Sequence, residues 1–570
     1  MKKTWKRSLS AVLALVMVLG ATACQSNGSS DTASTGGAAS TNTASGAETP
    51  EGPVENTLPI CEDGSITLKI YCPIDENARQ HMTDLSEHSV VKQIMEETGL
   101  NLEFIHPPAG DDGTYFNTTI ASGEYPDLFY CQDFNNYPGG PEGAMEDKIL
   151  LNIDDLIYQY APNFLAMVEG ERESVAEMGG DVDAWIRGDG GAIIKFGTMW
   201  LPEFVNARIH NGFVVRKDLL EKYNLESPVT IDDYTNVLQT FKDNGIEVPL
   251  ALCTFSETQF TNVNPIASAF GVSINEFQLD ENGKVEYSRT MPEYKDYLEL
   301  MNDWAERGLI DRDFISRSMS DANTLFYNGR AAMTIFHNVS TKQALSVGQL
   351  EDPDYDVAGV VYPRLNADDD LHLSRQALSV NSYAWYVSYT SEHPVEAVRF
   401  VDYLHMESTQ KLTAWGVGND EYPTYTVDED GVRHFTDFMQ NNPDMDYTTA
   451  RGVYTCGTLQ VKYDNDMEQQ QYNLPQNLQI WEAWATKNDN KQQIPSVVTM
   501  TVDESKEFTD IKTKMDNYAD EMVYKFIFGE ESLDKFDEFV NQLNALGAER
   551  AIEIKQAAYD RYLSRTEKME

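Results

Sequence analysis

Apolar and polar residues alternate along the first folded segment in the way that strands and amphipathic helices require. Residues 66–71 alternate as a strand does, and residues 89–97 place apolar side chains on one helical face before Gly99. Residues 100–105 and 127–130 give two further strands, with a helix expected between them. This strand–helix–strand–helix–strand order predicts a doubly wound parallel sheet, in which ligands bind beyond the carboxyl ends of the strands.

The alternation starts again further along the chain and predicts a second lobe of similar construction. Residues 193–196 and 213–215 are strand-like, residues 230–241 place apolar residues on one helical face, and residues 329–336 lead from a turn into a strand. Apolar and aromatic residues then step along one helical face within residues 511–543. We expect these aromatic residues to lie in the core.

Residues 280–287 predict a β-hairpin around an Asn-Gly turn. A calcium-binding loop is the alternative, but Val285 and Tyr287 stand where its next ligands would be. The sequence holds no HExxH, GxSxG or P-loop motif. We therefore expect no catalytic residues, no cofactor and no catalytic metal centre, while a structural calcium ion stays open.

The N-terminus has the pattern of an export signal. Basic residues precede a short apolar run, 9–23, which is too short for a membrane-spanning anchor. The run ends in Ala-Thr-Ala-Cys and resembles a lipobox, in which Cys24 would carry a palmitate-type lipid after residues 1–23 are removed. Residues 24–64 begin with a long stretch rich in Ser, Thr, Gly and Ala, and predict a flexible tether.

Charge excludes several classes of function. The 570 residues include 92 Asp and Glu against 43 Lys and Arg, which gives a formal net charge of -49. So acidic a surface repels phosphate backbones and anionic lipid headgroups, and we expect neither nucleic-acid binding nor a polybasic membrane surface. Beyond the N-terminal run there is no stretch of about 18 apolar residues, which argues against a permease or a channel.

Five cysteines besides Cys24 show neither CxxC spacing nor metal-like clustering. Cys61 and Cys72 are close enough in sequence to form a disulfide. Buried free thiols are an equally good interpretation, and the sequence does not choose between them.

Five short motifs follow one another along the folded part of the chain. They are residues 123–130 (GEYPDLFY), 212–218 (GFVVRKD), 227–234 (SPVTIDDY), 308–311 (GLID) and 326–333 (FYNGRAAM). With the lipobox and the polar tether, this series resembles the family 1 extracellular solute-binding proteins, the receptors of ABC sugar importers. The chain length and the run KQAAYDRY at 555–562 look like the long lipoprotein branch common in Gram-positive bacteria.

The resemblance implies a type II periplasmic-binding-protein-like α/β fold. Its two doubly wound lobes would be joined by a hinge, with the ligand cleft between them. Lobe 1 would comprise residues 65–206 and 382–470, and lobe 2 residues 207–381 and 471–570. The three boundaries between these segments are the expected hinge crossings.

The resemblance also implies which residues line the cleft. Sugars offer apolar ring faces that stack on aromatic side chains, and hydroxyls that need several hydrogen bonds. The matching positions are Asp75, Tyr130, Gln132 and Asp133 in lobe 1, Trp200 and Arg208 in the crossing segment, and Phe260, His337, Asn338 and Trp481 in lobe 2. Packing or capping is the alternative role for each of them, and Trp484 is the alternative to Trp481 as a stacking platform.

The expected function is that of a monomeric, lipid-anchored substrate-binding protein on the extracytoplasmic face of the cell membrane. It would capture an oligosaccharide and deliver it to ABC permease subunits, with no enzymatic step. A surface-anchored glycoside hydrolase is one alternative, and the same fold binding a peptide or another solute is a second. The sequence leaves the sugar, its linkage and its chain length open.

Overall fold

The computed structural model describes residues 54–567 with internal gaps. The gaps are residues 76–77, 80, 109–110, 178–180, 189–190, 200–208, 210, 255–264, 275–276, 374–379, 463, 465, 468–469, 471–473 and 496. Among the predicted functional residues, Cys24, Trp200, Arg208 and Phe260 lie outside the described residues. The signal peptide and most of the predicted tether lie outside them as well.

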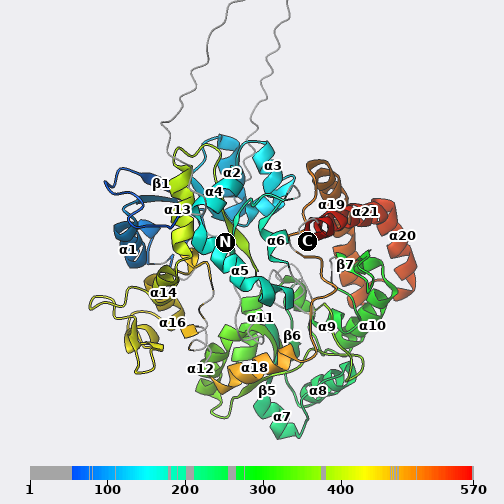
Figure 1. Cartoon of the computed structure of the whole chain (residues 1–570). Helices are drawn as coiled ribbons and strands as arrows, with labels where there is room; N and C mark the ends of the chain where they lie inside the picture. The colour runs from blue at the N-terminus through cyan, green and yellow to red at the C-terminus, as the bar shows by residue number, and fades with distance from the viewer. Residues whose placement is uncertain are drawn as a thin grey trace, which may run out of the picture. The chain divides into compact units, whose positions relative to one another are not determined.

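The first sheet contains the three strands that the N-terminal pattern predicts. Its strand order is β2-β1-β3-β11-β4, with β1 parallel to both β2 and β3 and with β11 antiparallel to β3 and β4. The strands are β1 (Thr67–Tyr71), β2 (Asn101–Ile105), β3 (Leu128–Cys131), β4 (Phe196–Met199) and β11 (Val380–Val387). The helices of this part are α1 (Ser89–Thr98), α2 (Asp112–Ser122), α3 (Gly140–Glu146), α4 (Asp154–Tyr160), α5 (Pro162–Glu177), α6 (Val182–Ile186), α13 (Pro394–Leu404), α14 (Glu407–Trp415), α15 (Asp437–Gln440) and α16 (Tyr447–Tyr454). Figure 1 shows α13 beside α4.

Local chemistry sets both ends of α1. The Nδ1 atom of His88 accepts a hydrogen bond from the Val90 N–H at 3.1 Å, which caps the first turn. Gly99 ends the helix with φ 69°, and its N–H donates to the Met95 carbonyl. A Cβ at Gly99 would lie 2.0 Å from the Cys61 carbonyl oxygen, so only glycine fits this turn.

The second sheet is mixed rather than mainly parallel. Its order is β10-β5-β9-β6; only β6 and β9 are parallel, whereas β5 is antiparallel to both neighbours. The strands are β5 (Asn211–Arg216), β6 (Val248–Ala251), β9 (Ala331–His337) and β10 (Val357–Gly359). The helices of this part are α7 (Lys217–Tyr223), α8 (Ile231–Asp243), α9 (Pro265–Ser268), α10 (Pro292–Glu306), α11 (Met319–Tyr327), α12 (Thr341–Glu351) and α18 (Pro475–Ala485). Figure 1 shows α18 beside β5.

The alternation of residues 193–196 groups this segment with the second lobe, whereas the lobe division that the resemblance implies places it in the first. β4 begins within this segment and pairs with β11 in the first sheet. The segment pairs with a strand almost 200 residues further along the chain, which its local pattern does not reveal. Each sheet has its own buried apolar clusters. The exact lobe boundaries stay a prediction.

The C-terminal helices form as the aromatic pattern predicts. They are α19 (Val502–Ile527), α20 (Phe536–Leu546) and α21 (Ala548–Glu567), and they pack on one another. Thr501 and Glu504 form a capping box at the start of α19. Phe526 and Phe539 are buried in the core of this part, as expected. Among the described residues, no helix combines the length and apolar character that a membrane span needs.

The segment at 280–287 is a hairpin, as predicted. β7 (Phe277–Leu279) pairs with β8 (Val285–Tyr287), and the Asp280 carboxylate accepts hydrogen bonds from the N–H groups of Asn282 and Lys284. A second hairpin joins β12 (Tyr425–Val427) to β13 (Arg433–Phe435). In the part of the chain that the structure describes, no cluster of three or more His, Cys, Asp or Glu residues could hold a metal ion. Cys61 and Cys72 are both free and buried, so no disulfide joins them.

The predicted tether is shorter than expected at its C-terminal end. Residues 54–64 pack onto the first sheet's part of the protein: Ile60 and Cys61 lie in its core, and the Val54 N–H donates to the Gln159 carbonyl at 2.8 Å. The Asn56 amide donates to the buried Asp402 carboxylate at 3.0 Å and to the Arg399 carbonyl at 2.8 Å. The prediction of a tether through residue 64 is therefore wrong for residues 54–64, because Ile60 and Cys61 supply apolar surface that can be buried.

We expect Asn56→Ala to lower the free energy of unfolding by about 1–3 kcal/mol, because it leaves a lone pair of the buried Asp402 carboxylate without its donor. Burial raises the pKa of Asp402, so this carboxylate depends on its remaining hydrogen bonds from Phe164 and Asn163. Urea unfolding checks the prediction. Asn441→Ala, at an exposed asparagine that bonds to a helix carboxylate, is the matched control. Equal, small effects in both variants would contradict the packed role of Asn56.

Candidate functional site: the carboxyl edge of the first sheet

Polar side chains from four segments meet where β1 and β3 end. These two parallel strands end at the same edge, so residues 72–75 and 132–133 lie there. β11 runs in the opposite direction and places Ala384 opposite Cys131, which brings Tyr383 to this edge from a distant part of the chain. α2 begins at Asp112, soon after β2 ends at the same edge.

Two carboxylates interact at this edge. Burial raises the pKa of Asp133, and the nearby Asp112 carboxylate raises it further. Burial also raises the pKa of Tyr383 to about 12, with smaller contributions from Asp112 and Asp133. Asp112 Oδ1 is buried and has no hydrogen-bond partner among the described residues. The edge therefore holds a carboxylate oxygen that a ligand donor could satisfy.

Aromatic rings lie beside the carboxylates. The half-buried Tyr115 ring stacks on the buried Tyr71 ring, with centroids 6.2 Å apart and an angle of 26° between the planes. Burial raises the pKa of Tyr71, and the nearby Asp133 and Asp112 carboxylates add to this effect. We call Tyr71, Asp112, Tyr115, Asp133 and Tyr383 the strand-edge cluster. Such a combination of ring faces and charged acceptors suits ligands that have both apolar faces and hydroxyl groups.

The structure brings the four predicted residues of the first lobe to this edge, in different environments. Asp133 is half-buried within the strand-edge cluster, and Gln132 is exposed next to it. The half-buried Asp75 accepts hydrogen bonds at its backbone carbonyl from Ala78 and Arg79. Tyr130 is only 4% exposed, and its ring packs against Tyr383 and Trp385 in the core.

The predicted residues of the second lobe lie at the end of β9 and on α18. Asn338 is 1% exposed; its carbonyl accepts hydrogen bonds from the side chains of Thr341 at 2.8 Å and Asn477 at 2.9 Å. The half-buried His337 pairs with Asn211 across the β5–β9 ladder. Trp481 is buried in the apolar cluster beneath α18. The contacts of Asn338 therefore hold α18 onto the second sheet.

The sequence reasoning missed four members of the strand-edge cluster: Tyr71, Asp112, Tyr115 and Tyr383. A signal for two of them was present. The rule that directs attention to strand ends applies equally to the first turns of the helix that follows β2, where Asp112 and Tyr115 stand. Tyr383 had no such signal, because its place depends on an antiparallel strand inserted from far along the chain.

Comparisons with known proteins agree with this fold. A family model described as bacterial extracellular solute-binding protein matches residues 84–411, more than half of the chain. The chain is 24% identical over 245 residues to the fructooligosaccharide ABC transporter substrate-binding protein FusA of Streptococcus pneumoniae, covering 40% of this chain and 43% of that protein. It is 24% identical over 249 residues to lipoprotein LipO of Bacillus subtilis, covering 41% and 47%. The chain thus spans less than half the length of these curated relatives.

Solved structures show the same architecture over most of the chain. An HMO-binding, ABC-transporter-associated solute-binding protein from Bifidobacterium longum infantis aligns with a TM-score of 0.71 at 16% identity. The alignment covers 88% of this chain and 99% of that protein. At this identity the likeness shows the fold alone, and it confirms the predicted two-lobe α/β class.

Proposed function

The chain belongs to the bacterial extracellular solute-binding proteins, and from this premise we propose that it is the lipid-anchored receptor of an ABC importer. It captures an oligosaccharide in a cleft between two lobes and delivers it to permease subunits, acting as a monomer on the extracytoplasmic face of the membrane. The names of its relatives support a sugar: one is a fructooligosaccharide transporter's substrate-binding protein, and a structural neighbour is an HMO-binding protein. Like these relatives, it acts by binding and not by catalysis.

One observation carries the sugar proposal: the buried, unpartnered Oδ1 of Asp112 beside the Asp133 carboxylate and the Tyr115 ring. Hydroxyl groups of a sugar donate to carboxylates, while the apolar face of its ring stacks on an aromatic side chain. Desolvated acceptors discriminate strongly, because a ligand without the matching donor leaves them unsatisfied. The exposed Gln132 amide adds a donor and an acceptor at the same edge.

The lobe division supports capture by closure. β4 and β11 belong to the first sheet, whereas β5 and β9 belong to the second, so the chain passes between the sheets after residue 199 and before residue 380. We place the third passage near residue 470. Trp200 and Arg208 fall within the first of these passages in sequence, and Phe260 belongs to the predicted second lobe. All three stay proposed ligand contacts, together with Asp75, His337 and Trp481.

A glycoside hydrolase is the second candidate, and the strand-edge cluster itself is the reason. Glycosidases use a pair of carboxyl groups, one with a raised pKa that acts as the general acid. Asp133, with its raised pKa beside Asp112, resembles such a pair. The family membership favours binding without hydrolysis, and the products of incubation distinguish the two functions.

Isothermal calorimetry against kestose, nystose, maltotriose, cellotriose, xylotriose and a tripeptide tests the proposal. We expect at least one sugar to bind with a dissociation constant of about 1 μM or lower, and the tripeptide not to bind. Chromatography of the recovered sugar should show it intact. Binding of the peptide but of no sugar would overturn the sugar proposal. Recovery of cleaved sugar would show that the protein is a hydrolase and not a receptor.

Lipid anchoring predicts the location of a single-residue variant. We expect Cys24→Ser to move the protein from the membrane fraction to the growth medium, because the thiol that would carry the lipid is absent. The acidic surface repels anionic lipids and so does not keep the protein at the membrane. Ser26→Ala, two residues away, is the control and should stay with the membrane. Immunoblots of the fractions measure the distribution. An unchanged distribution of Cys24→Ser would refute the anchor.

A further inference from the structure

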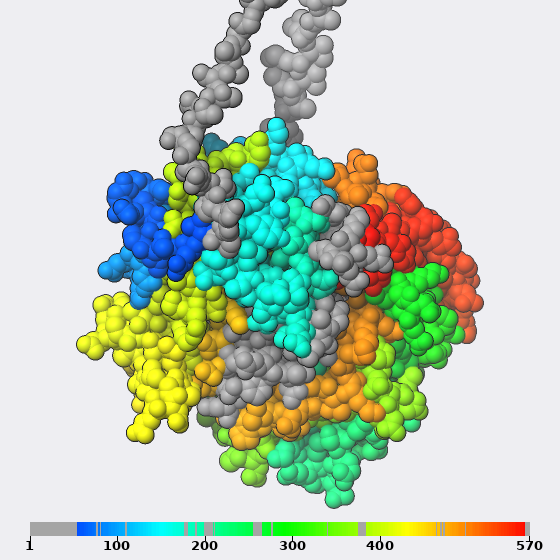
Figure 2. All heavy atoms as spheres, viewed as in Figure 1, coloured from blue at the N-terminus to red at the C-terminus, as the bar shows by residue number. Residues whose placement is uncertain are grey.

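Away from the strand-edge cluster, a groove runs along the solvent-facing side of α1. Two adjoining hollows of about 720 Å³ and 460 Å³ share Gln93, Glu97 and Val417 in their walls. One wall is α1, and the other is the segment that follows α14, residues 416–425. Figure 2 shows the surface of the segment around α14 and α16, in yellow, next to the blue surface of the first helix. We call this feature the α1 groove.

The walls of the α1 groove are held in place by the protein's own hydrogen bonds. Both oxygens of Glu97 are occupied, one by the Gln93 amide at 2.8 Å and the other by the Tyr403 hydroxyl at 2.7 Å. On the opposite wall, Asn419 Oδ1 accepts from the N–H groups of Glu421 and Tyr422 at 3.0 and 2.8 Å. The groove is therefore preorganised, which lowers the entropic cost of binding.

The turn before Asn419 is equally constrained. Gly418 has φ 64°, and a Cβ at this position would lie 2.4 Å from the Tyr425 ring. Tyr425 in turn packs edge-on against the buried Trp415, with centroids 6.1 Å apart. The outer wall thus rests on an aromatic cluster of its own.

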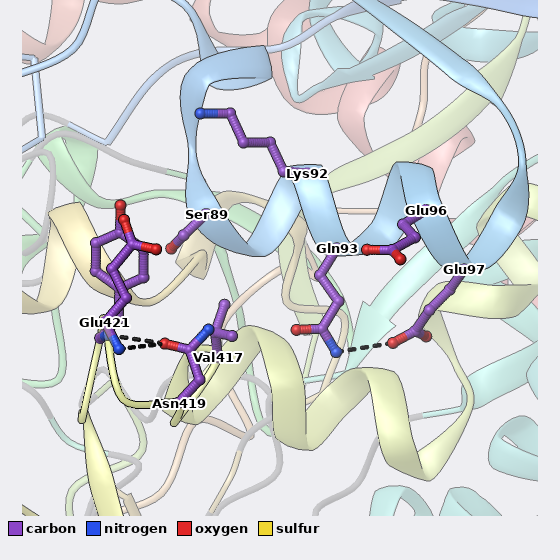
Figure 3. A pocket seen from close by; sticks show the side chains of 9 residues that line it. Ser89, Lys92, Gln93, Glu96, Glu97, Val417, Asn419 and Glu421 are labelled. Carbon is purple, nitrogen blue, oxygen red and sulfur yellow. Dashed lines mark hydrogen bonds between the residues drawn. The ribbon is translucent and has the colours of Figure 1, made fainter.

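Polar groups remain available inside the α1 groove. After the bonds described above, Gln93 keeps its amide oxygen and Asn419 its amide nitrogen, and Figure 3 shows these two side chains facing one another across the groove. The Ser89 hydroxyl, at the start of α1, has no hydrogen-bond partner among the described residues. Two planar amides and a hydroxyl form a set of neutral donors and acceptors at a fixed spacing.

An aromatic ring completes the groove. Tyr422 lines it beside the apolar Val417, and its ring is tilted against Tyr454 at 5.9 Å. The neighbouring Glu421 carboxylate raises the pKa of the Tyr422 hydroxyl. Lys92 and the carboxylates of Glu96 and Glu421 put charges of both signs on the walls, with no excess of positive charge that would select an anion.

We propose that the α1 groove is a second, weaker binding site for neutral oligosaccharides, separate from the strand-edge cluster. Gln93, Asn419 and Ser89 bind sugar hydroxyls, and the Tyr422 ring supports an apolar sugar face. The inference rests on the proposed function only for the class of ligand, because the α1 groove shares no residue with the strand-edge cluster. Such a site would hold sugar at the surface of the receptor at concentrations that already saturate the first site.

Methyl NMR of the full-length protein, labelled at valine, tests the inference through Val417. The probes are kestose and maltotriose, each titrated to millimolar concentration. We expect the Val417 methyl signals to shift along a saturable curve with at least one probe. Tyr422→Ala and, separately, Gln93→Ala should each lower the affinity obtained from this curve at least about tenfold. The sugar affinity of the strand-edge site, measured by calorimetry, should stay unchanged. Gln93 is half-buried at the surface of α1 and its side chain bonds to Glu97 within the same helix, so its substitution keeps the fold.

Two controls separate this inference from the proposed function. Tyr389→Ala removes a half-exposed aromatic ring outside the α1 groove and should leave the Val417 response intact. Asp133→Ala should weaken the strand-edge binding about 100-fold and likewise leave the Val417 response intact. An absent Val417 shift while calorimetry still detects sugar, or a shift unchanged in Tyr422→Ala and Gln93→Ala, overturns the second site alone. Absence of all sugar binding overturns the proposed function and the second site together.

Discussion

Asp133→Ala is expected to lower the affinity for the bound oligosaccharide by about 100-fold, without loss of stability. In the proposed complex the half-buried Asp133 carboxylate accepts sugar hydroxyls beside Asp112. Hydrogen bonds to charged groups contribute about 1.5–3 kcal/mol, and the unmatched hydroxyls of the ligand add a desolvation penalty. A loss of about 2.7 kcal/mol corresponds to the 100-fold change.

The stability of this variant follows from the sign of the Asp133 pKa shift. Burial, followed by the Asp112 charge, raises the pKa of Asp133 in the folded protein. A carboxyl group with a raised folded pKa favours the folded state below its unfolded pKa, and this contribution is lost as the pH rises through the folded pKa. At neutral pH the Asp133 charge therefore costs stability. Asp133→Asn should bind sugar weakly and unfold at a slightly higher temperature than the wild type.

Calorimetry and thermal unfolding of the same samples check both halves of this prediction. The matched control is Asp155→Ala, at an exposed aspartate on α4 away from the strand-edge cluster. It should bind sugar as the wild type does. Affinity for sugar should also fall as the pH is lowered through the raised pKa of Asp133, because protonation removes an acceptor. Wild-type affinity in Asp133→Ala would show that the ligand binds elsewhere.

Trp484→Ala should lower the free energy of unfolding by about 3–5 kcal/mol, the largest stability effect we expect. Trp484 is 0% exposed, its indole N–H donates to the Phe213 carbonyl at 2.9 Å, and its ring fills the space above Gly212. A Cβ at Gly212 would lie 2.5 Å from the ring. The substitution leaves a cavity and an unsatisfied carbonyl in the contact between α18 and the second sheet.

Urea unfolding of Trp484→Ala is compared with that of Leu478→Ala, on the same helix. Leu478 is 50% exposed, so its substitution should change stability by about 0.5 kcal/mol or less. A Trp484→Ala protein with wild-type stability and lost sugar affinity would show that this tryptophan stacks on the ligand and is not a core residue.

The first sheet was predictable because its pattern is local. Alternation in β1 and β2, the apolar face of α1 and the glycine that ends it lie within a few residues of one another. The place of Asp133 in the site followed as well, since a strand end fixes which edge of a parallel sheet its next residues reach. The partners of Asp133 were harder to find because they come from α2 and β11, and pairing between distant strands leaves no local signal.

The second sheet was less predictable for the same reason. β5 is buried on both faces, and a continuous apolar run does not reveal whether its neighbours are parallel or antiparallel. Asn338 and Trp484 show a related difficulty. Both residue types occur in sugar sites, but here their polar atoms bond to backbone carbonyls and side chains within the protein. Only the three-dimensional contacts reveal this use.

A crystal structure of the protein with the tightest-binding sugar of the calorimetric panel tests the central claim most directly. Our account predicts an intact sugar whose hydroxyls lie within hydrogen-bond distance of Asp112 and Asp133, with a ring face against Tyr115. It also predicts residues of the second lobe on the opposite side of the sugar. A sugar bound away from the strand-edge cluster, or found cleaved between the two carboxylates, would contradict the account.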